Sequence, residues 1–215
     1  MRLFAFLKTY ANLTKKEVTD LVNNNKVTVN NLSVGLLWNV EDNDVVKVNN
    51  IIIERVPFKY YLYYKPKGIT STISSRPDSY INHINVDSKM MLAGRLDKDS
   101  HGLMILSNDG NFINDILTNP LKEKEYIVKL EHKVTDEFID SIQKSYTIRG
   151  RDTNPMKVTI IDDFTIRLIL TDGKYRQIRN IVKFSNNYVL DLKRIRIDKY
   201  YLNDLKPGEI TEFNK

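Results

Sequence analysis

A ten-residue segment, Gly94–Leu103, carries the side chains with the clearest potential for chemistry. It places Arg95 and Asp97 two residues apart, adds a second carboxylate at Asp99, and runs into the apolar stretch 103–106. That stretch predicts a buried strand, so the acidic residues lie on a loop that enters it. A carboxylate on a loop held by a rigid strand is suited to attack on a substrate, and Asp97 is our candidate nucleophile.

Simpler roles for these side chains stay open at this point. Asp97 or Asp99 could cap a turn or the start of a helix, as many loop aspartates do. Their spacing with Gly102 also fits positions one, three and six of a calcium loop. That pattern fails further along, because His101 and Asn108 stand where the loop needs an oxygen ligand and a bidentate carboxylate.

The composition narrows the possible classes of function. The 215 residues include no cysteine, which excludes disulfides, thiolate catalysis and zinc knuckles, and the three histidines are scattered, so we expect no metal and no cofactor. No apolar run approaches the length of a membrane span, and Lys8 interrupts the apolar N-terminal stretch. We expect a cytoplasmic protein that makes no membrane contact and is a monomer.

The net charge of +6 is concentrated near the C-terminus. Residues 171–200 contain eight cationic side chains and only three aspartates, and aromatic residues are interspersed among the cations. This pattern predicts a surface that follows nucleic-acid phosphates, although a solvated face would look the same. The cations are Lys174, Arg176, Arg179, Lys183, Lys193, Arg194, Arg196 and Lys199.

The N-terminal part has the pattern of a small α+β domain. Apolar spacing predicts a helix over 3–10, and Thr14 followed by Glu17 has the form of a capping box that starts a second helix. An alternating segment then turns at Asn30-Asn31 and returns, which predicts a hairpin, and 44–48 predicts a further strand. After Pro57 the pattern changes to longer strands, so we place a domain boundary there.

Four motifs resemble those of the pseudouridine synthases, in the branch that includes the small-subunit rRNA enzyme A and the large-subunit enzymes B, E and F. They are the strand and Lys-Pro turn at 60–69, the segment Gly94–Leu103, the strand 123–128, and the stretch Gly173–Arg179. Their order and spacing match the family from residue 58 to 210, and the likeness is strongest to enzyme F.

The resemblance implies isomerisation of uridine to pseudouridine within RNA, without a cofactor. Asp97 matches the family's nucleophile, and Arg179 matches the cation that is its partner. Tyr126 matches the tyrosine that lies against the flipped uracil, and Arg95 matches the side chain that fills the space the base leaves. Arg176 is assigned to RNA contact.

The first part of the chain resembles the S4 RNA-binding domain that commonly precedes this branch of synthases. It departs from the family where Asn25 and Asn31 replace glycine, and asparagine is the residue that next best tolerates left-handed backbone angles. We therefore expect an α+β protein with an S4-like domain at 1–55 and a catalytic domain at 57–215, whose sheet is mixed, mainly antiparallel and flanked by helices. The RNA-binding candidates are Arg2, Lys8, Lys15, Lys16, Lys26, Lys65, Arg176, Lys193 and Arg194.

We expect the partner to be RNA, with 23S rRNA as the substrate. A transfer RNA modified in its anticodon region is an alternative, and so is a non-catalytic RNA-binding or ribosome-assembly factor on the same fold. The presence of Asp97, Tyr126 and Arg179 together favours an enzyme, since a protein that only binds RNA has no need of all three.

Overall fold

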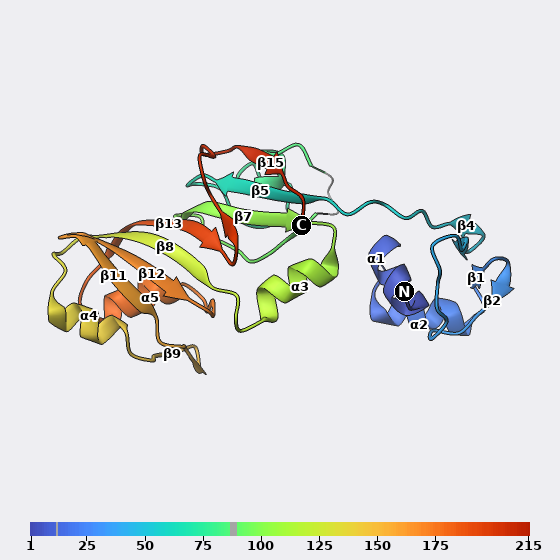
Figure 1. Cartoon of the computed structure of the whole chain (residues 1–215), viewed down its shortest axis with the longest axis horizontal. Coiled ribbons are helices and arrows are strands. Elements are labelled where there is room, and N and C mark those ends of the chain that lie inside the picture. Colours follow the sequence, from blue (N-terminus) through green and yellow to red (C-terminus); the bar gives the residue numbers. More distant parts are fainter. Residues whose placement is uncertain (12, 87–89) are drawn as a thin grey trace. The chain divides into compact units, whose positions relative to one another are not determined.

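The computed structural model describes residues 1–11, 13–86 and 90–215, and the chain divides into two compact units (Figure 1). The units are Met1–Phe58 and Lys59–Lys215. Within the described ranges, no helix is both long enough and apolar enough to cross a membrane.

The first unit packs two helices on a small antiparallel sheet of strand order β2-β1-β3-β4. The capping box is formed: the Thr14 side chain accepts from the Glu17 amide at 3.3 Å, and the Glu17 carboxylate accepts from the Thr14 amide at 2.7 Å. The apolar faces of the helices are buried against the sheet. The elements are α1 (Leu3–Tyr10), α2 (Lys15–Asn23), β1 (Val27–Val29), β2 (Leu32–Ser33), β3 (Val46–Val48) and β4 (Ile51–Ile52).

Asparagines form the tight turns of this unit. Asn25 has φ 54°, and the hairpin turn between β1 and β2 has φ 51° at Asn30 and 68° at Asn31. Two successive left-handed residues twist a two-residue turn to match the twist of its strands. The expectation that asparagine would serve at these turns is confirmed.

The second unit contains a nine-stranded sheet, built on the order β11-β12-β8-β13-β7-β5-β15 with β14 paired to β13 and β6 paired to β7. The β13–β7 pair is parallel and the other pairs are antiparallel. The prediction of a mixed, mainly antiparallel sheet is confirmed. Its strands are β5 (Tyr60–Lys65), β6 (Met91–Leu92), β7 (His101–Ser107), β8 (Lys124–Leu130), β11 (Lys157–Asp162), β12 (Thr165–Leu170), β13 (Val189–Ile197), β14 (Tyr200–Tyr201) and β15 (Ile210–Glu212).

Helices cover both faces of this sheet. Successive side chains of β7 alternate between two cores: Met104 joins the core that holds α4 and α5, and Ile105 joins the core that holds α3. The strand is therefore buried on both sides, as its continuous apolar sequence predicted. The remaining elements are a single 3₁₀ turn η1 (Tyr80–Asn82), α3 (Gly110–Thr118), α4 (Asp136–Ile142), α5 (Gln177–Phe184) and the separate hairpin of β9 (Thr147–Ile148) and β10 (Arg151–Asp152).

The parallel pairing of β7 with β13 requires a glycine where the motif loop enters the sheet. Gly102 lies opposite Arg194 with φ 110°, and a Cβ added to Gly102 would be 2.2 Å from the Arg194 carbonyl oxygen. That atom is backbone and cannot move aside without breaking the pairing. The glycine thus permits the close approach that brings the motif loop beside β13.

We expect Gly102→Ala to lower the free energy of unfolding by more than about 3 kcal/mol, because it adds a backbone clash to left-handed strain. Gly150→Ala is the matched control, since Gly150 has φ 72° but nothing within 4 Å of an added Cβ. Left-handed strain alone should cost that variant roughly 1 kcal/mol. Urea unfolding of both proteins measures the difference, and equal losses would show that the clash is relieved.

Candidate active site

One pocket of the second unit gathers most of the side chains that the sequence singled out. It lies between the motif loop, β8, β13 and the segment leading into α5, and its volume is about 190 Å³. This is more than ten times the roughly 10–15 Å³ that a cavity needs, on the same measure, to hold one water, so the pocket has room for a larger ligand. Its lining includes Arg95, Asp97, Tyr126, Arg176 and Arg179.

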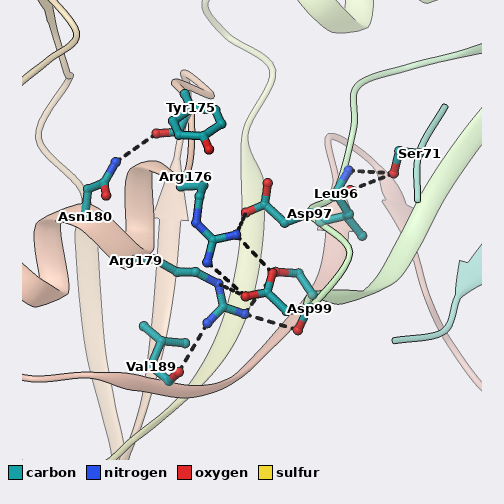
Figure 2. A network of polar contacts seen from close by, with 10 residues as sticks. Ser71, Leu96, Asp97, Asp99, Tyr175, Arg176, Arg179, Asn180 and Val189 are labelled. Carbon is teal, nitrogen blue, oxygen red and sulfur yellow. Dashed lines mark hydrogen bonds and ion pairs between the residues drawn. The ribbon is translucent and has the colours of Figure 1, made fainter. Parts of the chain in front are cut away.

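Hydrogen bonds outside the motif hold the loop that carries Asp97. The Ser71 hydroxyl donates to the Leu96 carbonyl at 2.7 Å and accepts from the Leu96 amide at 3.0 Å (Figure 2). The amide of Gly68, in the Lys-Pro turn, donates to the Lys98 carbonyl at 2.8 Å. Both contacts are to backbone atoms on either side of Asp97, so they fix its position and leave its carboxylate free to act.

Two arginines of the last motif converge on the two carboxylates of the loop (Figure 2). Arg176 donates to both oxygens of Asp99, at 3.2 and 2.9 Å, and lies 3.5 Å from the Asp97 carboxylate. The Nε of Arg179 lies 3.3 Å from Asp99. The expectation that Arg179 pairs directly with Asp97 is therefore wrong: Arg176, which we assigned to RNA contact, holds that position.

The two arginines of the last motif differ in backbone conformation and in what they contact. Arg176 precedes α5 in a left-handed conformation, with φ 47° and ψ 37°, which costs a non-glycine residue about 1–2 kcal/mol. Arg179 lies one turn into the helix and is directed at the backbone, donating to the carbonyls of Asp99 and Val189 at 3.2 Å each. Arg179 thus ties the loop to β13, and Arg176 faces the Asp97 carboxylate.

The same contacts set the electrostatics of the loop. Burial raises the pKa of Asp99, but the hydrogen bonds from Arg176 and the charge of Arg179 outweigh it, so the net pKa is below the ordinary value. Burial also lowers the pKa of Arg179, although the Asp99 carboxylate opposes this effect. An arginine stays charged in either case, and the loop therefore holds two carboxylates against two permanent cations.

Aromatic and apolar side chains also line the pocket. Tyr126, on β8, is 7% exposed and packs in the same core as Leu192 and Ile178, which also line the pocket. Arg95 is exposed at the opening. The arrangement can hold a flat ring against Tyr126 with a carboxylate in the same pocket and an exposed guanidinium outside.

Two predicted RNA contacts lie inside the protein. Lys65 is fully buried, and its ammonium donates to the carbonyls of Pro66 and Ile69 at 2.9 and 2.7 Å. Burial, with the nearby charge of Arg194, lowers the pKa of Lys65 to about 8. Arg194 is 1% exposed, and its Nε donates to the Leu103 carbonyl at 2.7 Å. Neither side chain is on the outer surface, so neither is available to phosphates there, and the contact of both residues with RNA stays a prediction.

The other cationic candidates differ in their surroundings. Lys193 is half-buried with its ammonium 5.5 Å from the centre of the Tyr64 ring. Arg196, counted in the basic stretch, is committed to Glu123 and Glu125 at 2.9 and 2.6 Å. The five candidates of the first unit are exposed, and their contact with RNA stays a prediction: Arg2, Lys8, Lys15, Lys16 and Lys26.

Sequence reasoning missed three residues of the site. Ser71 had no signal, because its partner Leu96 is reached only through the fold. Asp99 lies within the motif, but its spacing from Asp97 does not reveal that it takes both arginines. Lys124, in the pocket lining, stands two residues before Tyr126 on the same strand, and alternation would have placed both on one face.

Comparisons with known proteins agree on one family. A family model described as RNA pseudouridylate synthase matches residues 59–184. The dual-specificity RNA pseudouridine synthase RluF of Salmonella typhi is 32% identical over 213 residues, covering 97% of this chain and 74% of the relative. The ribosomal small subunit pseudouridine synthase A of Pasteurella multocida is 29% identical, covering the whole of both chains. A crystal structure of a pseudouridylate synthase is 26% identical with a TM-score of 0.70, covering 100% of this chain and 96% of that one.

The Arg176 contacts predict how Asp99 titrates. We expect Arg176→Gln to raise the pKa of Asp99, because burial then acts with less opposition, and Arg176→Lys to raise it less, since lysine keeps the charge but not the two-point contact. A depressed carboxyl pKa stabilises the fold above the unfolded-state pKa, and that stability is lost as pH falls. The glutamine variant should therefore be less sensitive to acid, relative to its own stability at neutral pH.

Carboxylate NMR titration of the three proteins measures this pKa directly. An Asp99 pKa that is the same in all three would contradict the pairing described above.

Proposed function

The chain belongs to the RNA pseudouridylate synthase family and is an RNA pseudouridine synthase, and we propose that Asp97 is its nucleophile and ribosomal RNA its substrate. The observation that carries the proposal is the meeting of Asp97, Tyr126 and Arg176 in one pocket of the matched segment. A nucleophilic carboxylate, a flat wall and a fixed cation are what breaking and remaking a glycosidic bond requires.

The reaction rearranges one nucleotide and conserves its atoms. A base within a folded RNA is stacked, so the target uridine must first turn out of the helix into the pocket. The N1–C1′ bond then breaks, the uracil turns, and C5 bonds to the same sugar carbon. Asp97 attacks the nucleoside, and Arg176, 3.5 Å away, supplies the counter-charge that keeps a partly desolvated carboxylate reactive.

Tyr126 and Arg95 act on opposite sides of the extruded nucleotide. The buried Tyr126 ring lies against the uracil and limits its movement while it is detached. Arg95, exposed at the pocket opening, enters the space that the base leaves in the RNA, where its planar guanidinium can stack and donate hydrogen bonds. Arg179 acts through the loop and is a positioning residue.

Within RNA, we propose 23S rRNA as the substrate. The motifs resemble the large-subunit enzyme F most strongly, and the relative named RluF, a dual-specificity RNA enzyme, is 32% identical, against 29% for the one named for the ribosomal small subunit. Pseudouridine mapping of rRNA and tRNA, from cells with and without this gene, tests the proposal. A modification that disappears from tRNA alone would favour the anticodon-region alternative, and an unchanged map would favour the non-catalytic one.

We propose that residues 1–55 form an S4-like RNA-binding domain and residues 57–215 the catalytic domain. The two compact units, which divide after Phe58, support this division. The first unit has the helix-helix-hairpin order, and its exposed cations are available to phosphates.

We expect Asp97→Asn to abolish pseudouridine formation, with a rate loss of at least about 10⁴-fold, because the amide has nearly the same shape but cannot act as a nucleophile. RNA affinity and thermal unfolding should change little. Asp163→Asn, the same change in a surface ion pair with Lys133, is the control and should keep full activity. Product formation by the Asp97 variant would end the assignment.

The proposed role of the first unit predicts a change in salt dependence. Replacing Lys8, Lys15, Lys16 and Lys26 by glutamine should lower the slope of log affinity against log salt by up to about 0.7–0.9 for each phosphate that the variant no longer neutralises. Turnover at saturating RNA should stay nearly constant. Filter binding over a range of salt concentrations gives the slope, and an unaltered value would mean that the second unit alone binds the RNA backbone.

A further inference from the structure

Two neighbouring strands place buried cations side by side in the active-site pocket. Lys124, on β8, is 7% exposed, and Arg194, on β13, is 1% exposed, and both belong to the pocket lining. Arg194 lies opposite Tyr126 in the sheet register, and Lys124 is two residues from Tyr126 on the same face. The pair therefore adjoins the wall against which the uracil is proposed to lie.

Neither cation has a carboxylate partner among the described residues. Lys124 makes one long hydrogen bond, 3.4 Å to the Lys122 carbonyl. Arg194 uses its Nε for the Leu103 carbonyl, and its buried Nη2 has no hydrogen-bond partner in the part of the chain that the structure describes. The adjacent Arg196 shows the contrast, since two glutamates neutralise it.

The nearest acidic influence does not neutralise the pair. Burial lowers the pKa of Lys124, the charge of Arg194 lowers it further, and Asp172 opposes both. Asp172, however, already accepts hydrogen bonds from Gln177 at 2.6 Å and from the Asn154 amide at 3.2 Å. Two unpaired buried cations cost several kcal/mol, and such an arrangement persists where a ligand supplies the missing charge.

We propose that Lys124 and Arg194 hold the extruded uracil by its carbonyl oxygens and stabilise the negative charge that the ring acquires when the N1–C1′ bond breaks. The inference rests on the proposed function. As that bond breaks, its electron pair passes to the uracil and spreads over N1, O2 and O4, and an Asp97 oxygen bonds to C1′. C5 then attacks C1′, and Asp97 leaves with its electron pair. The C5 proton passes to a base while N1 takes up a proton, so the product is an isomer of the starting uridine. Donors aimed at the intermediate charge lower the barrier to the first step.

Burial favours the base over a phosphate as the ligand. A phosphate within an RNA strand needs a path for the chain on both sides, whereas a uracil ring enters the pocket as the end of a side group. Lys124 and Arg194 are almost wholly enclosed, whereas Arg95, also in the lining, is exposed and is therefore available to the RNA backbone.

The test compares Lys124→Met with Lys129→Met in single-turnover assays on an RNA that the wild-type enzyme modifies. Lys129 is an exposed lysine at the far end of the same strand, so its variant loses the same charge outside the pocket. We expect Lys124→Met to slow pseudouridine formation about 10²-fold, as when one oxyanion donor is removed, with RNA affinity unchanged within about twofold. Lys129→Met should match the wild type, and Lys124→Arg should recover part of the rate.

A second substrate separates charge stabilisation from a structural role. Fluorine at C5 of the target uridine withdraws electrons and stabilises the uracil anion, so the rate deficit of Lys124→Met in glycosidic bond cleavage should shrink by at least about fivefold. If Lys124→Met does not fold, Lys124→Gln, which keeps a polar end, carries the same measurements.

Three outcomes would overturn the inference. The first is a Lys124→Met enzyme that forms pseudouridine at the wild-type rate. The second is a loss of RNA affinity at an unchanged rate, which would indicate a phosphate contact. The third is an equal rate deficit of Lys124→Met with the natural and the fluorinated substrates. Each would leave the proposed function intact. A wild-type protein that modifies no RNA would overturn the proposed function and this inference together.

Discussion

Two carboxylates on a short loop and two guanidiniums at the start of a helix face one another, and the rest of the catalytic unit depends on that contact. Asp97 and Asp99 alone would repel each other, and a loop carrying both would not settle in a half-buried position. Arg176 and Arg179 provide charge and directed hydrogen bonds, which are stronger than neutral ones. The fold of the second unit brings this helix start to the loop.

Several features of the sheet follow from that requirement. The loop must enter the sheet beside β13, because Arg179 binds both the loop and the Val189 carbonyl of β13. The parallel pairing of β7 with β13 brings the loop there, and Gly102 allows the two strands to approach closely. Ser71 fixes the opposite side of the loop through Leu96. The geometry of the carboxylates is thus held from three segments that are distant in sequence. The left-handed strain at Arg176 is the kind of local cost that active sites accept.

Local features of the chain could be predicted from the sequence, because their causes lie within a few residues. The Thr14 capping box, the asparagine turns and the buried strand β7 depend on side chains and backbone angles close by. Motif spacing predicted most of the pocket residues, because a motif records residues that must meet in space for one reaction. Which carboxylate each of Arg176 and Arg179 contacts could not be predicted from the sequence, because the motif spacing does not show how the segment leading into α5 approaches the loop. Cationic residues proved the weakest guide to surface position, because a cation in a sequence carries no sign of its depth. Lys65 is buried and donates to the Pro66 and Ile69 carbonyls, and Arg194 is buried and donates to the Leu103 carbonyl.

The asparagine turns also affect the chain before it folds. Among the described residues, most non-glycine positions with left-handed backbone angles are asparagines, including Asn49, Asn50, Asn186 and Asn203. A glycine at each would relax the native turn but would let the denatured chain sample many more conformations. Asparagine accepts a small native strain in exchange for a smaller loss of chain entropy on folding. The turns of this protein therefore contribute to its stability partly through the denatured ensemble, where no contact in the folded molecule records their effect.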